Sequence, residues 1–116
     1  MRVAIVGSRG YGNLTKVANY VATLAEDTVV VSGGAVGVDS AAERAALDRG
    51  LEVVVYLPDW ERYGKSAGIK RNAEIVEGAD MLVAFWDGVS HGTANSVDLA
   101  KRRGIQVTVI LENTDE

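Results

Sequence analysis

The chain has 116 residues, of which 47% are hydrophobic and 6% aromatic, carries a formal net charge of −4 and contains no cysteine. This length and composition predict a single domain with a mainly aliphatic core. The lack of cysteine excludes disulfides, thiolate zinc sites and cysteine nucleophiles, and the acidic balance disfavours a nucleic-acid backbone as a partner.

The chain begins with a predicted strand over 2–7, followed by a loop and a predicted helix over 14–26. The strand is a continuous apolar run, which is typical of strands buried on both faces of a parallel sheet. The loop opens with GSRG, and its arginine is able to bind a phosphate or carboxylate through two hydrogen bonds. An ordinary surface arginine explains the residue equally well. The candidate ligand residues here are Gly7, Ser8 and Arg9.

A second predicted strand spans 28–33 and a second helix 39–49, joined by the glycine-rich turn GGAVG. Glycines allow positive φ and close backbone approach, and the N-terminus of the following helix presents unpaired N–H groups. Together they suit an anion such as a phosphate, bound by backbone donors without a lysine. A tight turn with no ligand is an equally good interpretation. The candidates are Gly33, Gly34, Gly37 and Asp39.

The third unit is a predicted strand over 52–57, a polar loop and a helix over 66–77. In the loop, a tryptophan could stack on a base and an aspartate could bind ribose hydroxyls. A half-buried packing anchor is the alternative interpretation of the tryptophan. The candidates from this unit are Asp59, Trp60, Lys65, Arg71 and Asn72.

The fourth unit is a predicted strand over 80–86 and a helix over 93–103, and a fifth strand follows over 105–111. The loop GVSHGTAN makes a second junction between a strand, a glycine and a helix, which is again able to present N–H donors to an anion. The candidates are Asp87, Ser90, Gly92 and Thr93.

The strict alternation of strands and helices predicts an α/β fold. We expect a single Rossmann-like, doubly wound domain over 1–112, with about five parallel strands and helices on both faces. An acidic tail is expected over 113–116.

Local signals support the helix ends. Ser40 and Glu43 fit a capping box at the second helix, and Gly50 and Gly104 stand just beyond the second and fourth helices. Ile69, Ala73 and Val76 predict one buried apolar stripe on the third helix.

All four groups of candidates follow predicted strands. In open α/β sheets, ligands bind outside the carboxyl ends of the strands, so these groups are expected to form one site. One histidine and scattered carboxylates give no metal-ligand cluster. We therefore expect no metal and no required cofactor, although magnesium could enter with a phosphorylated ligand.

The segments GSRGYGN, VVSGGAVGVDSAAERAA and DWERYGKSAGIKRNAEIVEGADMLVAFWDGVSHGTANSVDLAKRRG together resemble the SLOG superfamily. The superfamily takes its name from the Smf/DprA and LOG proteins, and the chain is most similar to its compact YspA-like, YpsA-related branch. The resemblance covers nearly the whole chain. It rests on the order and spacing of GSR, GGAxGVD, KxxGxxRN, AFW and GT.

The resemblance implies a domain that binds nucleotides or ADP-ribose-type ligands at the strand ends. Members include ligand sensors in bacterial and phage conflict systems, so a sensor, a sequestering protein or a subunit is expected. By the same resemblance, Lys65, Arg71 and Asn72 would complete a polar wall of the site.

LOG enzymes, which cleave the base from a nucleoside monophosphate, carry the pattern PGGxGTxxE. Gly92 and Thr93 match it, but Ser96 stands at the position of the catalytic glutamate. Asp98 is a poor substitute, because two residues further along a helix is a rotation of about 200°. The departure argues against LOG-type hydrolysis.

Two other hypotheses accompany ligand binding. One is a nucleotide hydrolase or N-glycosidase that uses Asp39, Asp59 or Asp87. The other is single-stranded DNA binding, as in the DprA relatives, which the acidic balance and the lack of an interleaved basic and aromatic stretch disfavour.

The expected partner is a nucleotide-derived small molecule, and a homodimer formed through the helices is a further expectation. No apolar run approaches the ~20 residues needed to cross a membrane, and no signal peptide is evident. A cytoplasmic protein is therefore expected.

Overall fold

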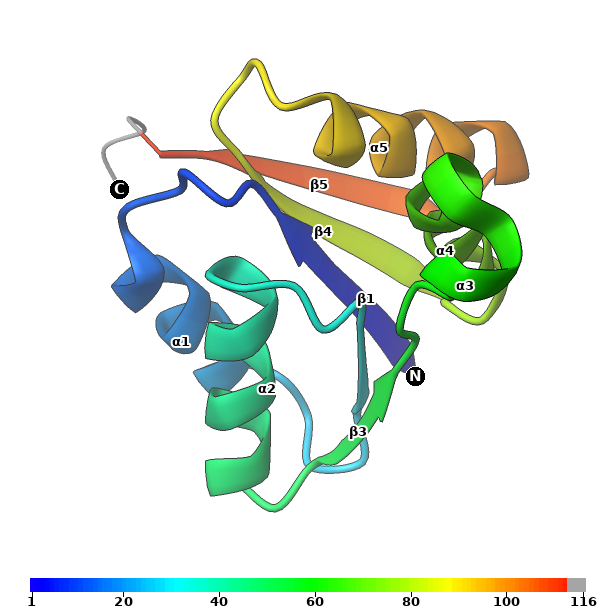
Figure 1. The fold of residues 1–116 in the computed structure, drawn as a ribbon. Helices are drawn as coiled ribbons and strands as arrows, with labels where there is room; N and C mark the ends of the chain where they lie inside the picture. Colours follow the sequence, from blue (N-terminus) through cyan, green and yellow to red (C-terminus); the bar gives the residue numbers. More distant parts are fainter. Residues whose placement is uncertain (113–116) are drawn as a thin grey trace.

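The computed structural model describes residues 1–112, which contain one five-stranded sheet in the order β3-β2-β1-β4-β5 (Figure 1). Every neighbouring pair of strands is parallel, which confirms the predicted α/β architecture. The acidic tail predicted over 113–116 lies outside the described residues. The strands are β1 (Arg2–Gly7), β2 (Val29–Ser32), β3 (Glu52–Val55), β4 (Met81–Trp86) and β5 (Gln106–Leu111).

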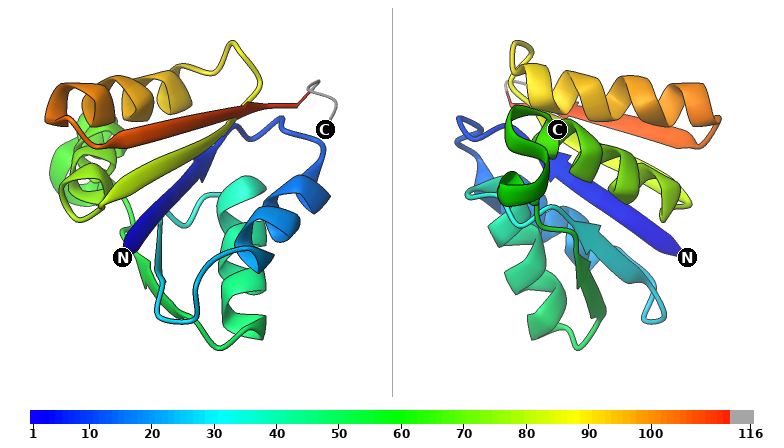
Figure 2. Two further views of the ribbon diagram at one scale, coloured as in Figure 1. Left: turned by 180° about the vertical axis from the view of Figure 1, so that it is seen from behind. Right: turned by 45° about the vertical axis from the view of Figure 1, so that its right-hand side comes forward.

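Helices cover both faces of the sheet, as predicted for a doubly wound domain (Figure 2). One face carries α1 (Leu14–Ala22) and α2 (Val38–Asp48), and the other carries α4 (Ala67–Glu77) and α5 (His91–Arg103). A short helix α3 (Trp60–Tyr63) and a 3₁₀ turn η1 (Gly64–Ser66) precede α4.

The core consists of two layers of aliphatic side chains separated by the sheet. Ile5 and Phe85 point toward α1 and α2, whereas Ala4 and Leu82 point toward α4 and α5, and all four are fully buried. The continuous apolar runs of β1 and β4 are explained by this burial on both faces. The edge strands β3 and β5 are only partly covered.

The predicted capping box of α2 is wrong. The helix is capped by Gly37 and begins at Val38, so Ser40 lies in the third helical position rather than at the cap. Its hydroxyl donates to the Ala35 carbonyl at 3.0 Å, and Glu43 accepts a hydrogen bond from Ser32. The predicted C-terminal glycines hold, because Gly50 and Gly104 both have positive φ, at 75° and 83°.

The apolar stripe predicted for the third long helix is also wrong at Ile69, which is 58% exposed. The buried residues of α4 are instead Ala67, Asn72, Ile75 and Val76. Asn72 takes a place in the interior because its amide nitrogen donates to Asn95 on α5 at 3.1 Å and to the Gly92 carbonyl at 3.3 Å. Among residues 1–112, no helix combines the length and the hydropathy needed to cross a membrane.

Candidate functional site

A cavity of about 450 Å³ lies at the carboxyl ends of the strands, beside the junction of β1 and β4. The chain leaves β1 toward β2 on one side, while β4 pairs with β1 on the other, so the strand order switches here. This is the place where open α/β sheets bind ligands. The sequence-predicted residues that line the cavity are Gly7, Arg9, Asp39, Arg71, Asn72, Asp87, Ser90, Gly92 and Thr93.

Other predicted residues lie outside the cavity lining. They are Ser8, Gly33, Gly34, Gly37, Asp59, Trp60 and Lys65. Conversely, Val6, Gly10, Ala35, Ile75 and Ser96 line the cavity without having been predicted. Four of these residues are small or apolar and carry no chemical signal in the sequence, whereas Ser96 occupies the position of the glutamate in the LOG pattern, which could have indicated it.

The glycine turn after β2 holds an anion, and that anion is the carboxylate of Asp39. One oxygen of Asp39 accepts hydrogen bonds from the N–H groups of Gly33 and Ala35, at 3.1 and 3.2 Å. The N–H of Gly34 donates to the Ser32 hydroxyl at 3.3 Å. A ligand anion would therefore have to displace Asp39 to reach the donors that the sequence assigned to it.

Asp39 is only 5% exposed, and burial raises its pKa from 3.8 to about 6. The N–H groups of Ala35 and Gly33 and the positive charge of Arg71 favour the ionised form, but they do not outweigh the desolvation. Asp39 is thus a cavity carboxylate whose protonation changes near neutral pH.

Arg71 brings a positive charge into the cavity from α4. Its guanidinium donates to the Gly33 carbonyl at 2.5 Å and to the side-chain oxygen of Asn72 at 3.1 Å. Both acceptors are neutral, and within residues 1–112 no carboxylate lies within ion-pair distance of Arg71. A Cβ at position 33 would lie 2.7 Å from the Arg71 nitrogen, so the glycine at this position makes room for the guanidinium.

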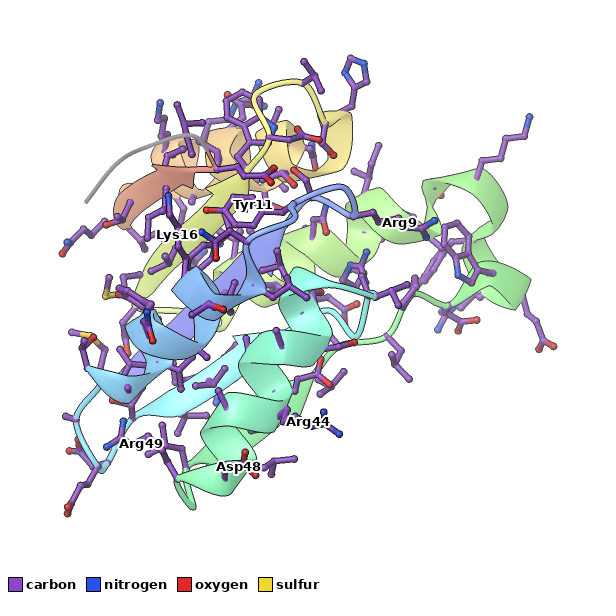
Figure 3. All side chains as sticks on the ribbon, turned by 90° about the vertical axis from the view of Figure 1, so that its left-hand side faces the viewer. Arg9, Tyr11, Lys16, Arg44, Asp48 and Arg49 are labelled. Carbon is purple, nitrogen blue, oxygen red and sulfur yellow. The ribbon has the colours of Figure 1, made fainter. Side chains whose placement is uncertain are left out.

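A second guanidinium, that of Arg9, enters from the loop after β1. Figure 3 shows its side chain extending away from α1 and α2, toward the side of the molecule that carries α3 and α4. Arg9 is exposed and, in the described part of the chain, forms no hydrogen bond or ion pair. The two arginines therefore line one cavity with no ion-pair partner among residues 1–112.

The N-terminus of α5 forms the opposite wall. Gly92 and Thr93 line the cavity in the first turn of this helix, where N–H groups have no partner within the helix. The preceding loop is held by Asp87, which accepts hydrogen bonds from the N–H groups of Val89 and Ser90 at 2.9 and 2.8 Å. These N–H groups keep the pKa of Asp87 below its usual value.

Ser8 lies behind the cavity and joins its walls. The side chain is 1% exposed, accepts a hydrogen bond from the Asp87 N–H at 3.1 Å and lies 3.4 Å from the Thr93 hydroxyl. The predicted residue therefore positions the loop after β4 and the start of α5 relative to β1.

The predicted residues of the third loop lie on a separate surface. Asp59 caps α3 by accepting a hydrogen bond from the Arg62 N–H at 3.1 Å, while Trp60 is 57% exposed and Lys65 is exposed. Tyr63 stands between two cations, with Arg62 at 5.2 Å and Lys70 at 4.8 Å from its ring centre. This surface combines aromatic and basic side chains.

The cavity lacks the carboxylate arrangement of the LOG pattern. Ser96 lines it, and its hydroxyl donates to the Gly92 carbonyl at 3.4 Å. Asp98 faces outward and pairs with Arg102 at 2.9 Å. The carboxylates of the cavity are Asp39 and Asp87. No group of three or more histidine or carboxylate side chains suited to a metal ion occurs within residues 1–112.

Comparisons with known proteins agree with this layout. The first 63 residues match the family described as "YspA, cpYpsA-related SLOG family". The Gene 61 protein of Mycobacterium phage D29 is 40% identical, in an alignment that covers 91% of this chain and 93% of that protein.

Two solved structures share the fold at low sequence identity. DNA processing protein A (DprA) from Streptococcus pneumoniae has a TM-score of 0.81 and 22% identity, and the match covers 93% of this chain and 49% of the DprA chain. DprA from Helicobacter pylori, solved for its single-stranded DNA binding mode, has a TM-score of 0.74 and 22% identity, with 94% and 64% covered. This chain therefore spans less than two thirds of either DprA chain, and the likeness shows the fold alone.

The family match and the phage relative together cover both halves of the sequence, and the parallel sheet agrees with them. The chain therefore belongs to the YspA, cpYpsA-related SLOG family.

Proposed function

We propose that this protein binds a nucleotide or another ADP-ribose-type phosphorylated ligand in the cavity at the β1–β4 junction. One observation carries the proposal. Arg9, Arg71 and the N-terminus of α5 line the same cavity, and among residues 1–112 no carboxylate forms an ion pair with either arginine. Such a set of donors is suited to phosphate oxygens.

The rest of the lining suits the remainder of such a ligand. Asp39 and Asp87 are acceptors for ribose hydroxyls, and Val6 and Ile75 give an apolar surface for a ring. A volume of about 450 Å³ falls within the ordinary range for small-molecule sites. The proposal requires no resident cofactor, and magnesium would enter only with the phosphates of the ligand.

Isothermal titration calorimetry with AMP, ADP-ribose and inorganic phosphate, with and without magnesium, tests the proposal. The variant Arg71→Gln should weaken binding of a phosphorylated ligand by at least about tenfold, because a charge-assisted hydrogen bond is lost. Arg102→Gln is the matched control, since Arg102 lies on the surface of α5. If none of the ligands binds, or if both variants bind as well as the wild type, the proposal fails.

The same incubations test whether a bound nucleotide is turned over. Asp39 is the acid–base candidate, because its pKa of about 6 lies near neutrality and it lines the cavity. Release of a base or phosphate that disappears in Asp39→Asn would identify an enzyme. Stable binding without products would identify a sensor or a sequestering protein.

A second candidate function is single-stranded DNA binding. It is favoured by the aromatic and basic surface of α3, where Trp60 is exposed and Tyr63 lies between Arg62 and Lys70. Exposed aromatic rings beside cations suit stacked bases and a phosphate backbone. Trp60→Ala should then weaken binding of an oligonucleotide, and the affinity should fall steeply with salt. An oligonucleotide affinity that changes neither with Trp60→Ala nor with the salt concentration would exclude this function.

A further inference from the structure

An open hollow of about 830 Å³ is lined by residues of α1, of α2 and of the turn before α2. Its walls are built mainly from small or apolar residues, namely Leu14, Ala18, Gly37, Ala41 and Ala45. The same face carries Leu47, a leucine that is 63% exposed. A projecting apolar side chain and an unfilled hollow thus lie on one surface.

Two opposite charges lie beside this hollow, four residues apart on α2. Figure 3 shows Arg44 and Asp48 on the outer side of the helix. Within residues 1–112 neither side chain forms a hydrogen bond or an ion pair. On α5, by contrast, Asp98 and Arg102 have the same spacing in the opposite order and pair at 2.9 Å. The order with the acidic residue first is the favourable one on a helix, so the charges of α2 remain available to a partner.

We propose that this face binds a second copy of the same chain, with the outer faces of the two α2 helices antiparallel across a two-fold axis that lies halfway between Arg44 and Asp48 along the helix. In this arrangement Arg44 meets Asp48 of the second copy, and Asp48 meets Arg44 of the second copy. Leu47 then lies against Leu47 of the second copy, because a two-fold axis brings the same flank of each α2 together.

The surface is self-complementary, which is what a two-fold interface requires. Arg44 and Asp48 are separated by about 6 Å along the helix axis, at 1.5 Å per residue, so both ion pairs form in one antiparallel register. Leu47 lies between them in the sequence, so the two leucines cover each other between the two ion pairs. A partner of another kind would need both the opposite charge order and a matching leucine, whereas a second copy has both.

This interface is independent of the proposed ligand site. The hollow shares no lining residue with the cavity, although Ser40 of the hollow follows directly after Asp39 of the cavity. A failure of ligand binding therefore leaves the inference on self-association standing, and the reverse also holds.

Sedimentation velocity of the full chain over a range of concentrations tests the inference. The wild type should form a dimer, and Leu47→Glu should weaken dimerisation by at least about 100-fold, because two leucines lose their burial. Ile69→Glu is the matched control, because Ile69 is an aliphatic residue of α4 with a comparable exposure of 58%. Circular dichroism establishes that both variants are folded.

Charge reversal tests the register. Arg44→Asp or Asp48→Arg alone should weaken the dimer by about tenfold or more, because each change replaces two attractive contacts with two repulsive ones. The double variant Arg44→Asp with Asp48→Arg should restore the wild-type dimer. The inference is overturned by a wild type that stays monomeric at every concentration. It is also overturned by a dimer that survives Leu47→Glu, or by single reversals that the double variant does not rescue.

Discussion

Replacing Asp39 with asparagine isolates the energetic cost of holding a carboxylate in the glycine turn. Asparagine has nearly the same shape, and its side-chain oxygen can accept the same hydrogen bonds from the N–H groups of Gly33 and Ala35. The variant therefore keeps the turn and removes only the charge. In the folded protein this charge lies in a site that is 5% exposed.

The magnitude follows from the pKa of Asp39, which burial raises from 3.8 to about 6. The difference of about two pH units corresponds to about 3 kcal/mol, at 1.36 kcal/mol per unit. Because the folded state holds the proton more tightly than the unfolded state, this stabilisation is fully present below pH 3.8. It is lost as the pH rises through about 6.

Asp39→Asn stays neutral and does not suffer this loss. The free energy of unfolding of the variant should equal that of the wild type near pH 3.5 and exceed it by about 3 kcal/mol above pH 6.5. Urea unfolding, followed by tryptophan fluorescence at several pH values, measures the difference, in which the titration of other groups cancels. A difference that does not change with pH would refute the argument. So would a variant that is less stable than the wild type at pH 8.

Three further substitutions test other contacts of the cavity walls and the core. Ser8→Ala should lower the free energy of unfolding by about 1–3 kcal/mol in urea unfolding, because the N–H of Asp87 loses its buried acceptor. Tyr11→Phe should leave the free energy of unfolding unchanged or raise it by up to about 1 kcal/mol, because the buried Tyr11 hydroxyl has no hydrogen-bond partner among residues 1–112. A clear loss of stability in the same assay would contradict this prediction. Gly33→Ala should displace the guanidinium of Arg71, because the new Cβ would lie 2.7 Å from its nitrogen, so calorimetry should show weaker phosphate binding from a protein that still folds.

Much of the fold could be predicted from the sequence because β1 and β4 are continuous apolar runs. Such runs suit only strands covered on both faces, and alternation with helices then requires parallel pairing. The positions of Arg9 and Asp87 at the cavity follow from the same logic. Each comes shortly after a central strand, and parallel strands bring their carboxyl ends to one edge of the sheet.

The occupant of the glycine turn could not be predicted in the same way. The contact of Asp39 with Gly33 and Ala35 depends on a helix cap at Gly37, whereas the capping box predicted from the sequence placed the cap three residues later, at Ser40. The position of the helix cap decides whether the Asp39 side chain reaches the N–H groups of the glycine turn or points away from them.

Two other features depend on tertiary contacts that no local pattern reports. Asn72 is buried against α5, and Val76 of the predicted apolar stripe is buried as well, whereas Ile69 of the same stripe is 58% exposed. Asp59 caps a short helix that the sequence pattern did not indicate, so it lies outside the cavity for which its chemistry suited it.

An amide-resolved NMR titration of the protein with ADP-ribose locates the ligand on the chain and so shows whether the cavity at the β1–β4 junction binds it. The largest shifts should fall on the loop after β1, around Arg9 and Gly10, and on the first turn of α5, around Gly92 and Thr93. Arg71→Gln should reduce all of these shifts together. Shifts confined to α3 around Trp60, or no shifts at all, would contradict the claim that the cavity at the β1–β4 junction is the ligand site.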